Sequence, residues 1–162
     1  MTTDIRTQLN KYFSKINVSN ITIIDWCSGR KKAQNHIHHK DCKIITVDRL
    51  PQRTPTIVAD ICKPITIEQA DMAFLTEALE HCVDDDMALD NVYNNLKDGG
   101  VAIISVPTKC KRHGNTDVGD FRRYTREQIC SLLEKHKFKI LEDYELRCDE
   151  ADRVGYLLKV QK

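Results

Sequence analysis

Short apolar runs alternate with polar stretches along most of the chain. Five runs lack the alternation of a half-buried strand, and they are residues 21–25, 43–48, 56–61, 71–76 and 101–107. Continuous apolar runs of this length are typical of strands buried on both faces of a parallel sheet. Residues 139–147 and 156–161 are two further strand candidates. The pattern therefore predicts a sheet of seven strands.

Three segments have helical spacing. The first carries apolar residues at Ile5, Leu9, Phe13 and Ile16. The second begins at a cap formed by Asp84–Asp86, and Gly99–Gly100 is expected to end it. The third follows a capping box at residues 125–128. Strands that alternate with helices predict a doubly wound α/β sheet.

The connections on either side of the third strand are short. Residues 49–55 and 62–70 are too few for the usual crossover helix of a parallel pair. We therefore expect the sheet to be pared down around its third strand. A chain of 162 residues fits one domain, so residues 1–162 are predicted to form a single unit.

Composition narrows the functional class. Hydrophobic residues make up 41% of the chain, which is enough for a core, and the net charge of +1 argues against a general electrostatic grip on nucleic acid. No apolar run approaches the roughly 20 residues of a membrane span, and the N-terminus lacks the apolar block of a signal peptide. The seven scattered cysteines suit reduced thiols, so a cytoplasmic location is expected.

The first strand runs into a loop with one glycine, IIDWCSGRK (23–31). Asp25 ends the strand, and Gly29 lies where the chain is expected to turn into a helix. Ligands of doubly wound sheets bind beyond the carboxyl ends of the strands. One glycine is a weak signal, and an ordinary strand-to-helix turn is the alternative.

Two more acids end the next two predicted strands. Asp48 lies nineteen residues after Gly29, where an acid can accept both hydroxyls of a ribose. Asp60 could accept the exocyclic amine of an adenine. A simple turn role is the alternative for each of them. The opening loop and Asp48 together favour a ligand that contains a nucleoside, although the missing GxGxxG spacing counts against a dinucleotide.

The segment TEALEHCVDDD (76–86) follows the fourth strand directly. Thr76, Glu77, Glu80 and His81 should therefore lie at the rim of the cleft. An imidazole titrates near neutrality, so His81 could take a proton from an acceptor. A histidine packed under a loop is the alternative.

These motifs, in this order, resemble the class I S-adenosylmethionine-dependent methyltransferases, most closely the methyltransferase type 11 group. The resemblance covers about residues 20–145 and rests on IIDWCSGRK, TVD, VADI, ADMAFLTEALEHCVD and LKDGGVAIISVP. EALEH is the most specific match, and DFRRYT (120–125) resembles a subgroup pattern. The resemblance implies a mostly parallel seven-stranded sheet with an antiparallel strand near the C-terminus.

The resemblance also implies roles for individual residues. The cofactor would be S-adenosylmethionine, held by Asp25, Cys27, Ser28, Gly29, Asp48, Arg49, Asp60, Ile61 and Thr76. Glu77 and His81 would lie at the reacting groups, as catalytic residues. The acceptor would contact Arg122, Arg123, Tyr124 and His113. Cys27 and Lys31 depart from the family pattern, because both positions are usually glycine.

The acceptor should lie against the long loop of residues 107–125. Its arginines suit phosphate or carboxylate, so an anionic small molecule is expected, with a solvated basic loop as the alternative. The Asn/Asp-Pro-Pro-aromatic motif of many nucleic-acid methyltransferases is absent, so a nucleic-acid acceptor is not expected. Either this loop or a partner, such as a second copy of the chain, would cover the acceptor.

A metal site was weighed on two short histidine motifs. His36, His38, His39 and Cys42 form H-x-H-H-x-x-C, and Cys110 with His113 forms C-x-x-H. This spacing matches no closed four-ligand zinc site, so no metal is expected.

Three functions remain open. The leading hypothesis is methyl transfer to a small or anionic acceptor through oxygen or nitrogen. The second is a non-catalytic relative that serves as a binding or scaffold subunit, suggested by Cys27 and Lys31. The third is a nucleotide-binding oxidoreductase, which the glycine pattern disfavours.

Overall fold

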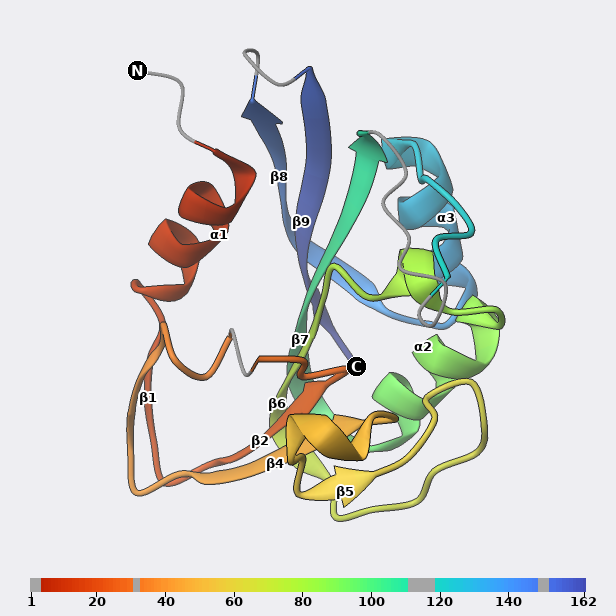
Figure 1. Cartoon of the computed structure of the whole chain (residues 1–162). Helices are drawn as coiled ribbons and strands as arrows, with labels where there is room; N and C mark the ends of the chain where they lie inside the picture. Colours follow the sequence, from red (N-terminus) through yellow and green to blue (C-terminus); the bar gives the residue numbers. More distant parts are fainter. Residues whose placement is uncertain (1–3, 31–32, 111–118, 149–151) are drawn as a thin grey trace.

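The computed structural model describes residues 4–30, 33–110, 119–148 and 152–162. Its main sheet has seven strands in the order β5-β4-β2-β6-β7-β9-β8 (Figure 1). They are β2 (Thr22–Trp26), β4 (Lys43–Asp48), β5 (Ile57–Val58), β6 (Ala70–Thr76), β7 (Leu96–Lys109), β8 (Lys139–Cys148) and β9 (Arg153–Gln161). Only β9 runs in the opposite direction to the other six strands, so it pairs antiparallel with both β7 and β8. This confirms the predicted mostly parallel sheet with an antiparallel strand near the C-terminus.

The strand order reverses between two central strands. From β2 the chain builds outward through β4 to β5, and it then returns to add β6 on the other side of β2. Such a reversal leaves a crevice beyond the carboxyl ends of the strands, because the loops of β2 and β6 leave in opposite directions. The fold therefore places the loops after β2, β4 and β6 around one crevice.

Helices cover both faces of the sheet (Figure 1). Helix α1 (Ile5–Phe13) lies on one side, and α2 (Asp85–Asn94) and α3 (Arg126–Lys135) lie on the other. Two short 3-10 helices, η1 (Pro51–Arg53) and η2 (Leu79–His81), follow β4 and β6. Each face has its own core: Phe13 packs edge-on against Phe74 under α1, with ring centroids 5.7 Å apart. On the other face Leu89 and Ile129 are fully buried.

The capping box was predicted correctly, but the end of α2 was not. The Thr125 hydroxyl accepts from the Gln128 amide, and the Gln128 side chain accepts from the Thr125 amide. Helix α2 ends at Asn94, five residues before Gly99. The prediction was wrong because the Asn95 carbonyl accepts from the Ala70 amide, which already draws the chain alongside β6. Gly99 and Gly100 are therefore part of β7.

The third strand is shorter than the predicted 56–61. It contains only Ile57 and Val58, which pair with Val47 and Asp48. A strand this short agrees with the prediction that the sheet is pared down on this side. The fifth strand is longer than expected, because β7 extends from residue 96 to residue 109.

The segment after the glycine loop also differs from the expectation. Residues 33–37 form turns rather than the expected helix. Two strands that the sequence did not predict, β1 (Asn17–Ser19) and β3 (His38–Lys40), pair in parallel to form a separate small sheet. Apart from the half-buried Val18, their residues are polar and exposed, so no apolar run marks these strands. Ala33 and Ile37 have buried side chains, and these pack in the core under α1 although their segment is not helical.

Candidate functional site

A cavity of about 430 Å³ opens at the carboxyl ends of β2, β4 and β6. All nine residues predicted to hold the cofactor line it: Asp25, Cys27, Ser28, Gly29, Asp48, Arg49, Asp60, Ile61 and Thr76. Glu77 and His81, predicted to be catalytic, line it too. The fold therefore brings these residues to one site, as the order of motifs predicted.

The loop after β2 has an unusual backbone. Cys27 and Gly29 both have left-handed conformations, with φ of 52° and 51°. The Ser28 amide between them donates to the Val47 carbonyl at 3.1 Å, and Ser28 is buried. A left-handed conformation costs a non-glycine residue about 1–2 kcal/mol. The geometry thus explains why glycine would suit position 27 and shows that cysteine is strained there.

The Asp48 carboxylate connects the loops that follow β2 and β4. Oδ2 accepts from the Gly29 amide at 2.8 Å, and Oδ1 accepts from the Leu50 amide at 2.9 Å. A carboxylate has about four acceptor positions, so each oxygen can accept one more hydrogen bond. Asp48 therefore has the turn role that was weighed for it, and it retains the capacity to bind hydroxyls.

Asp25 is a buried carboxyl group on the cavity wall. It is 2% exposed, and Oδ2 has no hydrogen-bond partner among the described residues. Burial, together with the nearby charge of Asp48, raises the pKa of Asp25 to about 8. A buried carboxyl group without a partner is costly, and a positively charged ligand group would satisfy it.

Asp60 forms a turn on the wall of the cavity. Oδ1 accepts from the Cys62 amide at 3.0 Å, and the Asp60 carbonyl accepts from the Lys63 amide at 3.0 Å. The turn role weighed for Asp60 is therefore real. Asp60 also lines the cavity beside Ile61, so a ligand contact through Oδ2 stays a prediction.

The loop after β6 holds the two predicted catalytic residues. Glu77 is left-handed, with φ of 51°, and its Oε1 accepts from the Ser105 hydroxyl at 3.0 Å. His81 Nδ1 lies 2.5 Å from the Gly119 carbonyl, and a carbonyl oxygen only accepts, so Nδ1 carries the proton. Nε2 lies 3.7 Å from Glu80 Oε1. Nε2 is thus the imidazole atom that can accept a proton.

Glu80 lies beneath the site rather than on its wall. The side chain is fully buried, and its burial, reinforced by the charge of Glu77, raises the pKa of Glu80. The Glu80 backbone carbonyl accepts from the Phe121 amide at 2.8 Å. Glu80 therefore connects η2 to the segment that carries Phe121.

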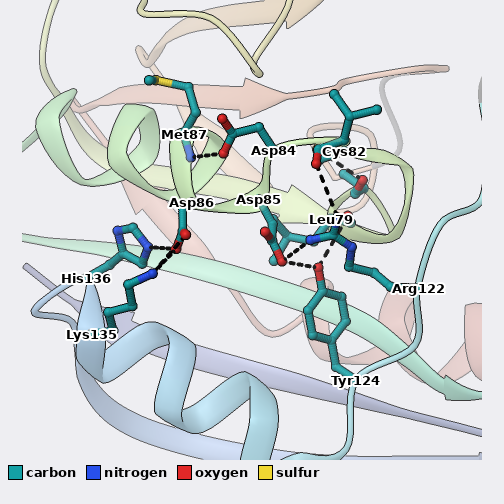
Figure 2. Close-up of polar contacts among 12 residues, drawn as sticks. Leu79, Cys82, Asp84, Asp85, Asp86, Met87, Arg122, Tyr124, Lys135 and His136 are labelled. Carbon is teal, nitrogen blue, oxygen red and sulfur yellow. Dashed lines mark hydrogen bonds and ion pairs between the residues drawn. The ribbon is translucent and has the colours of Figure 1, made fainter.

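The predicted acceptor residues have partners within the protein (Figure 2). Asp85 Oδ2 accepts from the Tyr124 hydroxyl at 2.9 Å and lies 2.5 Å from Arg122 Nη1. Arg123 pairs with Asp120, with Nη2 2.8 Å from Oδ2. None of Arg122, Arg123 and Tyr124 lines the cavity. His113 lies outside the described residues.

Sequence reasoning missed several cavity residues. They are Arg6, Arg30, Leu50, Arg53, Cys62, Cys82, Val83 and Phe121. Arg30 directly follows the glycine loop, so its position was available as a signal. Arg6 comes from α1, and nothing in the local sequence links it to the loop after β2.

The histidine motifs do not form a metal centre in the described part of the chain. No group of three or more His, Cys, Asp or Glu side chains there could hold a metal ion. All seven cysteines are free thiols. The helices described are also too short or too polar to cross a membrane.

A family model described as "Methyltransferase domain" matches residues 7–104, which is more than half of the chain. A carboxy-S-adenosyl-L-methionine synthase from Cronobacter sakazakii is 30% identical over 89 residues. That alignment covers 44% of this chain and 36% of the relative, so the chain spans little more than a third of the curated protein it matches.

Two solved structures have the same fold. The 1,6-didemethyltoxoflavin-N1-methyltransferase of Burkholderia thailandensis, with S-adenosylhomocysteine bound, has a TM-score of 0.72 at 15% identity and covers 98% of this chain and 78% of its own. The N-methyltransferase NodS of Bradyrhizobium japonicum, also with S-adenosylhomocysteine, has a TM-score of 0.67 at 16% identity, covering 97% and 85%. At this identity the likeness establishes the fold.

Proposed function

This chain belongs to the methyltransferase domain family, and we propose that it transfers a methyl group from S-adenosylmethionine to an oxygen or nitrogen of a small molecule. The observation that carries the proposal is the convergence of three strand-end acids, Asp25, Asp48 and Asp60, on one cavity. The proposal treats residues 1–162 as one domain.

The polar groups on the cavity wall suit this cofactor. The carboxyl group of Asp25 can pair with the ammonium of the methionine part, and it has an oxygen without a partner for that purpose. Asp48 has acceptor capacity left for ribose hydroxyls, since each of its oxygens accepts one hydrogen bond from a backbone amide. Asp60 and Ile61 lie on the same wall for the adenine.

The protein's chemical task is small. Bound S-adenosylmethionine supplies a methyl group on a positively charged sulfur, which is a good leaving group. The residues of this chain have to align the acceptor and keep water out. His81 Nε2 is placed to accept a proton from an acceptor that must lose one, and Ser105 holds the carboxylate of Glu77 in a fixed position.

A second candidate is a binding or scaffold subunit that has the fold but no activity. The strained Cys27 favours it, because a side chain there narrows the loop that would hold the methionine part. In such a protein a partner chain, or a second copy of this one, would be the functional target. The oxidoreductase hypothesis gains nothing from the family match.

Calorimetry with S-adenosylhomocysteine tests the proposal. We expect the wild type to bind it, and Asp48→Ala to bind it at least about tenfold more weakly, because two ribose hydrogen bonds are lost. Asp98→Ala is the matched control. Asp98 is fully exposed, and it lies in β7, which β6 separates from β2 in the sheet. Both variants are checked by thermal melting.

Because Asp48 also accepts hydrogen bonds from the Gly29 and Leu50 amides, its substitution could disturb the loops, and a second test that varies the ligand is needed. Adenosine should bind the wild type more tightly than 2′,3′-dideoxyadenosine, and this comparison does not depend on how a variant folds. Equal affinity of the two nucleosides would show that the ribose assignment is wrong. If S-adenosylhomocysteine fails to bind at millimolar concentration, the enzyme proposal is wrong.

A further inference from the structure

We propose that the methyl acceptor is a small organic anion with an apolar body, and that Arg6 and Arg30 bind its carboxylate or phosphate group. This inference rests on the proposed function and names the substrate class of the same site. It assigns the anion site to residues of α1 and of the loop after β2, in place of the arginines of the 107–125 loop.

The first argument is the charge of the cavity. Among the described residues, its wall has four arginines and four carboxyl groups: Arg6, Arg30, Arg49 and Arg53 with Asp25, Asp48, Asp60 and Glu77. The charges of these eight groups balance when all are ionised, which for Asp25 requires that a cationic group of the cofactor offset the burial that raises its pKa. S-adenosylmethionine brings one net positive charge, because its sulfonium and ammonium groups outnumber its carboxylate. A singly charged anionic acceptor would restore neutrality in a site where water is excluded.

The second argument is that the cofactor does not need all four arginines. A Cβ built on Gly29 would lie 4.0 Å from Arg53 Nη1, so the Arg53 guanidinium lies over the loop assigned to the methionine part. One guanidinium can bind one carboxylate with two hydrogen bonds. Arg49 directly follows the proposed ribose acid. Arg6 and Arg30 remain for a second anion.

The third argument is the pairing of the arginines. Arg6 and Arg30 are exposed at the cavity, and neither makes an ion pair with another residue in the described ranges. Arg122 and Arg123, by contrast, are paired with Asp85 and Asp120. An anion that bound to Arg122 or Arg123 would have to compete with a carboxylate already in contact. Among the described residues, Arg6 and Arg30 have no such competitor.

The fourth argument concerns the rest of the acceptor. Val83 is 65% exposed and Phe121 is 44% exposed, and both line the cavity. The Phe121 amide donates a hydrogen bond to the Glu80 carbonyl, which holds the backbone of Phe121 beside η2, the element that carries His81. Exposed apolar side chains at a cavity mouth favour a ligand with an apolar part. The acceptor therefore combines an apolar body with one negative group.

The test uses benzoate and its neutral isostere benzamide as probes. Each is titrated into the full chain saturated with S-adenosylhomocysteine, at a fixed ionic strength of about 0.1 M, and binding is followed by amide chemical shifts. We expect benzoate to bind and benzamide to bind at least about tenfold more weakly. Inorganic phosphate should displace benzoate, because the two share the anion site.

Variants locate the site. Arg6→Ala and Arg30→Ala should each weaken benzoate binding about tenfold, a loss of about 1.4 kcal/mol, without changing the affinity for S-adenosylhomocysteine by more than about twofold. Arg6→Lys retains the charge and should recover most of the loss. Arg126→Ala is the matched control, since Arg126 is an exposed arginine on α3 paired with Asp143, and it should bind benzoate like the wild type.

Three results would overturn the inference. Benzoate could bind no better than benzamide, or equally well to the wild type and both alanine variants, or it could displace S-adenosylhomocysteine instead of binding beside it. The last result would assign the arginines to the carboxylate of the cofactor. Failure of S-adenosylhomocysteine itself to bind would overturn the proposed function, and this outcome is separate because it is measured before any probe is added.

Discussion

At Cys27 the side chain does not suit the backbone conformation that the site requires. Its left-handed φ of 52° belongs to the turn that the Ser28 and Gly29 amides fix through Val47 and Asp48. The thiol packs against the core that contains Cys82, and a hydrogen bond with Cys27 is the largest cause of the raised pKa of Cys82, ahead of burial. The side chain thus gains contacts that offset part of the strain.

We predict that residue 27 sets the stability of this loop through its backbone. Cys27→Val should lower the free energy of unfolding by at least about 1 kcal/mol, because a β-branched residue tolerates a left-handed φ poorly. Cys27→Gly should be close to the wild type, since relief of strain offsets the lost thiol contacts. Urea unfolding measures both.

Cys130→Val is the control for the change of side chain. Cys130 is a partly buried cysteine in α3, where φ is ordinary. The free energy of unfolding of Cys130→Val should fall by only a few tenths of a kcal/mol, which is about the cost of valine in a helix. Equal stability of Cys27→Val and Cys27→Gly would show that the conformation at residue 27 carries no strain.

Residues of the site differed in how far the sequence predicted them. Asp25, Asp48 and Asp60 were predicted because each lies at or close to the end of an apolar run that is visible in the sequence. The ion pair of Arg122 with Asp85 was not, because the two residues meet only when the 119–125 segment packs on the start of α2 (Figure 2). Charge in the sequence does not say which arginines are paired.

At the scale of elements, two asparagines take over the hydrogen bonds that a longer third strand would have made: Asn91 of α2 and Asn95, which directly follows α2. Asn91 Nδ2 donates to the carbonyls of Ile61 and Lys63 at 2.7 Å, and Oδ1 accepts from the Ile65 amide at 2.9 Å. Asn95 binds the following residues in the same way. Side chains thus satisfy backbone groups that a longer strand would have paired. Periodicity cannot predict this, because it reads apolar spacing only.

We therefore predict that Asn91→Ala is severely destabilising. It would leave three backbone groups of the 61–65 segment without partners in a site where Asn91 is buried, at a total cost of at least about 2 kcal/mol. Ile61 and Cys62 belong to the cavity wall, so affinity for S-adenosylhomocysteine should fall as well. Chemical unfolding and calorimetry measure the two effects.

Asn94→Ala is a matched control on the same helix. Asn94 is exposed and contributes its backbone carbonyl to Gln69, a bond that alanine retains. Its stability should change by less than about 0.5 kcal/mol. Since alanine favours a helix more than asparagine does, a loss of stability in Asn94→Ala as large as in Asn91→Ala would mean that the side-chain bonds of Asn91 to the loop are not the cause of the loss.

At the scale of the whole molecule, two buried carboxyl groups set how stability depends on pH. Asp25 faces Asp48 across the cavity wall, and Glu80 lies among Glu77, Asp120 and Arg123. Burial raises the pKa of both groups, that of Asp25 from 3.8 to about 8. No local sequence feature predicts these raised pKa values, because they depend on how the sheet, η2 and the 119–125 segment enclose the two carboxyl groups.

The sign of the pH dependence follows from proton binding. Each group has a higher pKa when folded than when unfolded, so the folded chain binds more protons between the two values. The free energy of unfolding should therefore fall as the pH rises from about 5 to about 8, and level off above about 8. Urea midpoints across this range, without cofactor, measure the slope.

Substitutions assign the slope to its source. Asp25→Asn and Glu80→Gln remove the titrating groups while keeping shape, so each should flatten the decline between about pH 5 and pH 8, and together they should abolish most of it. Asp98→Asn, at a fully exposed position, should leave the slope unchanged. Exposed carboxylates with lowered pKa values, such as Asp71 and Asp86, contribute stability that is lost only below this window. A wild-type stability that rises with pH from 5 to 8 would mean that Asp25 and Glu80 are ionised in the folded protein, and that the cavity wall is more highly hydrated than their burial indicates.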